Sequence, residues 1–202
     1  MGNKKVSVVI ATYNQEKYIR HTLESVVNQK TNFEFEALVG DDCSTDGTAA
    51  VVREFAEKYP DIIVPFIREK NLGMGGNTAD LVFRTSGEYV AFIEGDDYWI
   101  DDYKLQKQVD FLDSHQDYVA CFGLCQIVDE NEVRQPDREQ YSGFMKEGGD
   151  EAELKMADED PAYQVKATVA EAFDSILCSK FYRLLSYGML VRANELALSG
   201  LT

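Results

Sequence analysis

Tyr89-Val90-Ala91-Phe92-Ile93 runs directly into Glu94-Gly95-Asp96-Asp97. The first five residues are of types that favour a buried β-strand, and the glycine marks a turn at its carboxyl end. Carboxylates this close together repel one another unless a cation lies between them. Mg²⁺ and Mn²⁺ prefer oxygen ligands and usually take only one or two from the protein, which leaves room for substrate phosphates. The stretch therefore predicts a metal–diphosphate site at a strand tip; the alternative is that Asp96 and Asp97 are solvated turn or capping residues.

Strand-like and helix-like patterns alternate along the rest of the first half of the chain. We expect strands at 6–10, 35–39, 62–67 and 89–93, and helices at 16–28, 49–58, 77–84 and 103–113. Pro65 places the third strand at a sheet edge or a bulge. The alternation predicts βαβ units and a mostly parallel, Rossmann-like α/β sheet flanked by helices. In such sheets ligands bind beyond the carboxyl ends of the strands, where the strand order switches.

The loop after the first strand carries residues suited to a planar base. Tyr13 can stack on such a base, and backbone groups at Ala11 and Thr12 can bond its edge. Asn14 belongs to the same candidate site, with a helix N-cap as its alternative role.

The loop after the second strand begins with an acceptor. Asp42 can accept a hydrogen bond from a pyrimidine ring N–H, whereas residues 44–48 supply turn and capping side chains. Farther on, a glycine-rich segment at 71–77 contains Asn71 and Asn77, which either bond a nucleotide's base or ribose or simply close a turn. This segment is neither a dinucleotide fingerprint nor a Walker motif.

Composition excludes several classes of protein. The 202 residues carry a net charge of −16, which argues against a nucleic-acid binder and against direct docking on anionic lipid. Four cysteines without CxxC spacing and only two histidines argue against a zinc site. No apolar run approaches the roughly 18 residues of a transmembrane helix, and no signal-peptide pattern is visible, so we expect a cytoplasmic protein.

Five segments, in order and spacing, resemble the inverting family-two glycosyltransferases with a GT-A fold. They are VSVVIATYN (6–14), DDCSTDGT (41–48), NLG (71–73), EGDDYW (94–99) and KLQKQ (104–108). The resemblance covers about residues 6–125. It implies transfer of a sugar from a nucleotide-diphospho-sugar, usually UDP-linked, to a hydroxyl of a glycan or lipid-linked acceptor. It also implies a divalent cation (Mn or Mg), a role in polysaccharide or cell-surface glycan synthesis, and a location at most peripheral to the inner face of the membrane.

Residue by residue, the resemblance implies that Ala11, Tyr13 and Asp42 line the nucleotide's base. Asp96 and Asp97 match the metal and diphosphate-sugar motif. Glu94 stands where many relatives have Asp, so which carboxylate binds the metal and which the ribose is left open. Relatives also often have Gly where Cys43 stands and Pro where Tyr103 stands.

We expect two regions: a nucleotide-sugar-binding α/β domain at 1–128, and an acidic loop plus a helical acceptor-side segment at 129–202. The acidic run at 129–160 is typical of a solvated loop, with a lid as the functional alternative. Helix-like periodicity returns at 165–190, and 194–198 reads as a helix. The family's catalytic base follows the acceptor-side segment, and no carboxylate at 192–202 stands out, so we expect the base beyond Thr202 and the acceptor side to be truncated.

Two other classes of function remain open. A catalytically inactive nucleotide-sugar-binding module would keep the same cleft without transferring a sugar. A nucleotidyltransferase would also use paired acids, but no basic glycine-rich loop for a triphosphate follows the first strand.

Overall fold

One sheet organises the computed structural model of the chain, which describes residues 4–116, 120–123, 128, 133, 162–165 and 189–193. Within these ranges its strands are β1 Val6–Thr12, β2 Phe35–Asp41, β3 Ile63–Ile67, β4 Tyr89–Glu94, β5 Ala120–Gly123, β6 Ala162–Val165 and β7 Leu190–Arg192. They lie in the order β3-β2-β1-β4-β7-β5-β6. β1 pairs in parallel with β2 and β4, and β2 pairs in parallel with β3.

The strand order reverses at β1, because β2 and β3 lie on one side of it and β4 on the other. The ends of β1 and β4 therefore form the switch point at which open α/β sheets bind ligands. β3 is an edge strand, as Pro65 predicted, and an edge can lack one backbone donor without losing an inner ladder bond.

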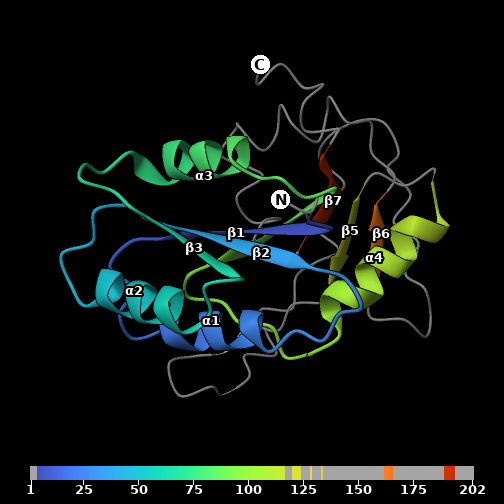
Figure 1. Ribbon diagram of the computed structural model, residues 1–202, viewed down its shortest axis with the longest axis horizontal. Coiled ribbons are helices and arrows are strands. Elements are labelled where there is room, and N and C mark those ends of the chain that lie inside the picture. Colours follow the sequence, from blue (N-terminus) through green and yellow to red (C-terminus); the bar gives the residue numbers. More distant parts are fainter. Residues whose placement is uncertain are drawn as a thin grey trace.

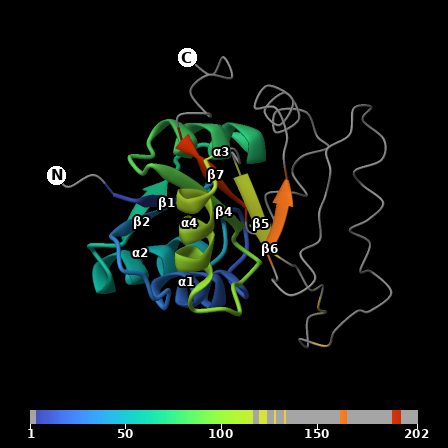
Figure 2. The same ribbon diagram turned by 90° about the vertical axis from the view of Figure 1, so that its right-hand side faces the viewer.

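Helices cover both faces of the sheet (Figure 1). They are α1 Ile19–Val27, α2 Thr48–Lys58, α3 Gly73–Phe83 and α4 Lys104–Ser114. Figure 1 shows α3 on one face and α1 and α2 on the other, and Figure 2 shows α4 beside β7. Alternate residues of β1, Val6, Val8 and Ile10, are fully buried in a core cluster shared with α1, α2 and α4. The predicted α/β class with a mostly parallel sheet is confirmed.

Two predicted helices begin elsewhere than expected. α1 begins at Ile19 rather than at 16, because the preceding residues form a turn in which Tyr18 N–H donates to the Gln15 carbonyl. α3 begins at Gly73 rather than at 77, so most of the predicted glycine loop is helix. The amides at its start find acceptors: Leu72 N–H donates to Asp42 Oδ1 (2.7 Å), and Gly73 N–H donates to Asn71 Oδ1 (2.9 Å). These bonds satisfy groups that a helix start otherwise leaves unpaired.

The helix-like reading of 165–190 is wrong at both ends. Val165 ends β6 and Leu190 begins β7, so both residues are in extended backbone, which long-range strand pairing stabilises. The interior of that segment and the predicted helix at 194–198 lie outside the described residues. So does the acidic run at 129–160, apart from Val133. The division at residue 128 stays a prediction, although β7 from the second region lies between β4 and β5.

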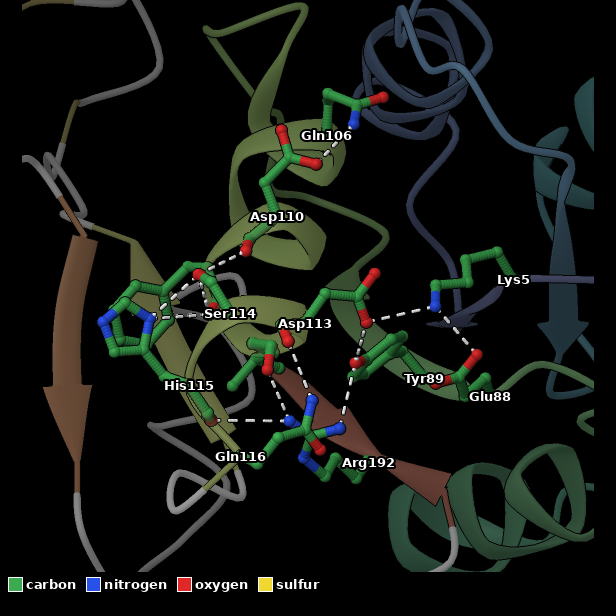
Figure 3. Close-up of polar contacts among 12 residues, drawn as sticks. Lys5, Glu88, Tyr89, Gln106, Asp110, Asp113, Ser114, His115, Gln116 and Arg192 are labelled. Atoms are coloured by element: carbon green, nitrogen blue, oxygen red, sulfur yellow. Dashed lines mark hydrogen bonds and ion pairs between the residues drawn. The ribbon is translucent and has the colours of Figure 1, made fainter.

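A polar cluster joins β7 to the amino end of β4 (Figure 3). The buried Tyr89 hydroxyl donates to Asp113 Oδ1 (2.6 Å) and accepts from Arg192 Nη1 (3.0 Å). Lys5 Nζ donates to the same Asp113 oxygen (3.1 Å) and to Glu88 Oε2 (2.8 Å). Burial, with the hydrogen bond to Asp113, raises the pKa of Tyr89, so its phenol stays a donor. This cluster stabilises the end of the sheet opposite residues 94–97.

Within the described residues, no helix has both the length and the apolar character needed to cross a bilayer.

Candidate functional site

A cleft of about 360 Å³ opens at the carboxyl ends of β1 and β4. Its walls come from β1 and the loop after it, from the residue that follows β2, from the start of α3 and from β4. The lining residues are Val9, Ala11, Thr12, Tyr13, Gln15, Asp42, Asn71, Gly73, Met74, Asn77, Thr78, Phe92, Ile93 and Glu94. The cleft therefore lies at the predicted switch point.

Reciprocal hydrogen bonds join the loop after β1 to the loop after β2. Asn14 N–H donates to Ser44 Oγ (2.9 Å), and Thr45 N–H donates to Asn14 Oδ1 (2.8 Å). Two residues farther along, Gly47 N–H donates to Glu16 Oε2 (3.0 Å). Asn14 is not among the cleft-lining residues and does not cap α1, because its side-chain oxygen holds the neighbouring loop instead. This pairing fixes the positions of Tyr13 and Asp42 relative to each other.

Asp42 is buried at the cleft wall and anchors the start of α3. Its Oδ1 accepts from Leu72 N–H, and its carbonyl accepts from Asn71 Nδ2 (3.1 Å). Its second carboxylate oxygen accepts from none of the described residues. Asp42 can thus anchor the wall and still accept one hydrogen bond from a ligand.

The next residue, Cys43, has a left-handed backbone conformation with φ of 66°, which costs free energy for any residue other than glycine.

Asn77 is also buried, and both ends of its amide contact the protein. Nδ2 donates to the Gly40 carbonyl (2.8 Å), and Oδ1 accepts from Arg68 Nε (3.3 Å). Asn71 bonds Asp42 and Gly73 in the same manner. Both asparagines line the cleft, but the hydrogen bonds that their side chains make in this structure hold α3 against β2 and the residue after it.

Residues 94–97, hereafter the acid loop, pack tightly against the end of β1. Gly95 N–H donates to the Ala11 carbonyl (3.0 Å), and the Gly95 carbonyl accepts from Thr22 Oγ1 (2.9 Å). A Cβ added at Gly95 would lie 2.6 Å from Thr12 Oγ1 and would also collide with Gln15 Oε1. A glycine is therefore required between Glu94 and Asp96 because no side chain fits there.

The carboxylates of the acid loop lie close together, and their burial and mutual repulsion are electrostatically unfavourable. Glu94 lines the cleft, and Asp96 is exposed. Asp97 is partly buried, and its shielded Oδ2 accepts no hydrogen bond from the part of the chain that the structure describes. Burial, with repulsion from Asp96, raises the pKa of Glu94 to about 6. Burial, with repulsion from Asp96 and Glu94, raises the pKa of Asp97 to about 7. A cation beside these groups would relieve both the repulsion and the unpaired oxygen.

The donor set suits a hard cation that shares its coordination with a ligand. Within the described ranges, no three His, Cys, Asp or Glu side chains form a group that could enclose a metal ion. Mg²⁺ and Mn²⁺ do not need one, because they are commonly bound by one or two carboxylates and complete their shell with phosphate oxygens and water. Asp96 and Asp97 therefore fit such an ion, although they are not themselves cleft-lining residues.

The structure brings most of the predicted residues to one cleft: Ala11, Thr12, Tyr13, Asp42, Asn71, Asn77 and Glu94. It adds residues that the sequence did not single out: Val9, Gln15, Gly73, Met74, Thr78, Phe92 and Ile93. Period-two alternation could have found Val9 and Phe92, since they share strand faces with Ala11 and Glu94. Met74 and Thr78 could be placed only once α3 was known to begin at Gly73.

A family model and a curated relative both relate this chain to glycosyltransferases. A family model described as Glycosyl transferase family 2 matches residues 7–165. The putative teichuronic acid biosynthesis glycosyltransferase TuaG of Bacillus subtilis is 38% identical over 107 residues, which are 53% of this chain and 41% of TuaG. The chain spans less than half the length of the curated relatives it matches.

Two solved structures share the fold. Staphylococcus aureus TarS 1–349 in complex with UDP-GlcNAc matches with a TM-score of 0.57 and 27% identity, over 94% of this chain and 45% of that one. The mannosyltransferase PcManGT of Pyrobaculum calidifontis, in complex with GDP-Man and Mn²⁺, matches with a TM-score of 0.52 and 26% identity. That match covers 59% of this chain and 35% of PcManGT.

Proposed function

The chain belongs to glycosyl transferase family 2, and on that premise we propose that its cleft binds a UDP-linked sugar for transfer to a hydroxyl acceptor with inversion. The observation that carries the proposal is the position of the acid loop. It places three mutually repelling carboxylates at the switch point, next to a cleft whose other wall carries Asp42 and Tyr13. One of them, Asp97, has a buried oxygen that accepts no hydrogen bond from the described residues. The complexes of TarS with UDP-GlcNAc and of PcManGT with GDP-Man and Mn²⁺ support a nucleotide-sugar and a divalent cation here.

We assign recognition of the base to the wall formed by β1 and the residue after β2. Tyr13 is about half exposed and lines the cleft, so its ring is available for stacking on a base. Asp42 has one carboxylate oxygen committed to Leu72 N–H, and the other can accept from the ring N–H of uracil. Ala11 and Thr12 can offer backbone groups, and Asn71 and Asn77 keep the wall in place.

We assign the cation to Asp96 and Asp97, with Glu94 facing the cleft as the third acid of the loop. A bound divalent cation supplies positive charge that stabilises the departing nucleoside diphosphate. The acceptor hydroxyl attacks the anomeric carbon from the face opposite the diphosphate, which inverts the configuration, and a general base takes its proton. None of the described residues is assigned as that base. The names of TuaG and of TarS, a poly(ribitol-phosphate) β-N-acetylglucosaminyltransferase, support a glycan acceptor and a role in cell-surface polysaccharide synthesis.

Calorimetric titration of the chain with UDP, GDP and ADP, each with and without Mn²⁺, tests the proposal. We expect UDP to bind most tightly and only weakly without Mn²⁺. Asp96→Asn should remove the Mn²⁺-dependent part of the affinity, whereas Asp61→Asn, an exposed aspartate after α2, should change nothing. Equal and metal-independent affinity for all three nucleotides would contradict the proposed site.

A further inference from the structure

The side-chain amide of Gln15 lines the cleft beside the acid loop and is not used by any of the contacts described above. We propose that Gln15 is a diphosphate-binding residue, with Nε2 donating hydrogen bonds to phosphate oxygens of the nucleotide. The assignment rests on the proposed function, since it adds a neutral donor to the same donor-sugar site.

The backbone of Gln15 is held from three directions. Its N–H donates to Thr48 Oγ1 at 2.8 Å. Its carbonyl accepts from Tyr18 N–H at 2.9 Å and from Ile19 N–H at 3.0 Å. The residue is therefore anchored between the start of α2 and the start of α1, and its position is fixed before any ligand binds.

The side chain is oriented as well as positioned. Thr12 Oγ1 donates to Gln15 Oε1 at 2.7 Å, which commits the carbonyl end of the amide. The same Oε1 lies against Gly95 so closely that no Cβ could be added there. These two contacts place the amide group beside Gly95, in the middle of the acid loop. Nε2 donates to none of the described residues, so its two N–H donors are available to a ligand.

Gln15 differs in this respect from the two other amide side chains of the cleft. Asn71 Nδ2 donates to the Asp42 carbonyl and Asn77 Nδ2 donates to the Gly40 carbonyl, so both have structural partners. Only the Gln15 amide, among the three in the cleft lining, has both donor hydrogens free of described partners.

The charge of the cleft explains why a neutral donor suits this position. Among the described lining residues, the charged ones are the acids Asp42 and Glu94. An uncharged N–H donor can bind a diphosphate oxygen beside these acids without forming an ion pair with them. A lysine in place of Gln15 would form an ion pair with the acid loop and would compete with the cation for the same carboxylates. A glutamine binds phosphate oxygens without that competition.

The test compares UDP with uridine, both titrated in the presence of Mn²⁺, for the unaltered chain and two variants. Gln15→Met removes the amide, and Gln15→Glu keeps an acceptor for the Thr12 hydroxyl while removing both donors. Gln116→Met, on the exposed end of the segment after α4, is the matched control. Hydrogen bonds to charged groups are worth about 1.5–3 kcal/mol, so each Gln15 variant should bind UDP at least roughly tenfold more weakly. Uridine affinity and Mn²⁺ affinity of Gln15→Met should stay the same, while its unfolding midpoint should fall because the buried Thr12 hydroxyl loses its acceptor.

Four outcomes would overturn the assignment, and the last of them would overturn the proposed function as well. Equal losses for uridine and UDP would mean that Gln15 acts on the base or on the fold. A loss that appears only with a UDP-sugar would assign the contact to the sugar. Unchanged UDP binding in both variants, with normal binding by the unaltered chain, would refute the Gln15 assignment and leave the proposed function standing. If the unaltered chain binds no nucleoside diphosphate, the proposed function falls and the assignment falls with it.

Discussion

Asp97→Asn should stabilise the protein when no divalent cation is present. In the folded chain the Asp97 carboxyl has a pKa of about 7, because it is partly buried and lies near Asp96 and Glu94. Its ordinary value is 3.8. Since the folded state holds this proton more tightly than the unfolded state does, the contribution of Asp97 to the free energy of unfolding is most favourable below about pH 4. It falls as the pH rises through the window from about 4 to about 7.

The size of the effect follows from the two pKa values. At 1.36 kcal/mol per pKa unit, ionised Asp97 costs the folded state about 4 kcal/mol above pH 7, and about 2 to 3 kcal/mol of this develops between pH 5 and pH 8. An asparagine has nearly the same shape and carries no charge, so it avoids this cost. The variant should be more stable than the unaltered chain at pH 8 and much closer to it at pH 5.

Urea unfolding in the presence of EDTA at pH 5 and pH 8 measures this difference. With an m-value of about 2 kcal/mol/M, the midpoint of Asp97→Asn at pH 8 should exceed that of the unaltered chain by roughly 1 to 2 M. Adding Mn²⁺ should stabilise the unaltered chain and leave the variant nearly unchanged, because only a bound ligand shifts the equilibrium. Asp61→Asn is the control. The reasoning is refuted if the difference between variant and parent is the same at both pH values.

Two further changes test the geometry of the cleft. Gly95→Ala should lower the free energy of unfolding by about 1 to 3 kcal/mol, measured by urea unfolding, because its Cβ would overlap Thr12 Oγ1. The control is Gly76→Ala, where the added Cβ meets only Leu72 Cβ at 3.2 Å, and it should cost less. Equal losses of stability in the two variants would argue against the tight fit at Gly95. Cys43→Gly should raise the free energy of unfolding by up to about 1 kcal/mol, because glycine adopts a φ of 66° without strain. Cys43→Ala should give no such gain, and a gain of the same size there would show that the thiol rather than the backbone is responsible.

The fold could be predicted where local pattern and global fold agree. The four parallel strands β1 to β4 are short, mostly apolar runs, and the helices between them each bury one face. The start of α3 could not be predicted, because glycines are poor helix formers and the acceptor that satisfies Leu72 N–H is Asp42, thirty residues away. The strands β5, β6 and β7 were missed because their partners lie far away in the sequence.

The same distinction separates the predicted site residues from those that were missed. Tyr13, Asp42 and Glu94 follow strands that the sequence already indicated, so their arrival at one cleft follows from topology. Their roles toward a nucleotide stay predictions. Gln15 gains its importance from a local hydrogen bond with Thr12 and from its tertiary contact with Gly95, neither of which periodicity reveals. Asn77 shows the opposite. Its amide side chain suggested a contact with a ligand, but in the structure that amide forms hydrogen bonds with Gly40 and Arg68.

The position of β7 in the sheet has a consequence for the nascent chain on the ribosome. β5 and β6 pair with each other, but they join β4 only through β7, whose residues are made about 70 positions after β5 begins. Leu190, the first residue of β7, is made 96 residues after Glu94, the last residue of β4. At roughly 5–20 residues per second, translation therefore leaves the open edge of β4 uncovered for roughly 5 to 19 seconds. During that interval an exposed row of backbone donors and acceptors can recruit a strand from another polypeptide. Translation stalled before Leu190 would therefore favour aggregation of a product in which strands β1 to β4 are already made.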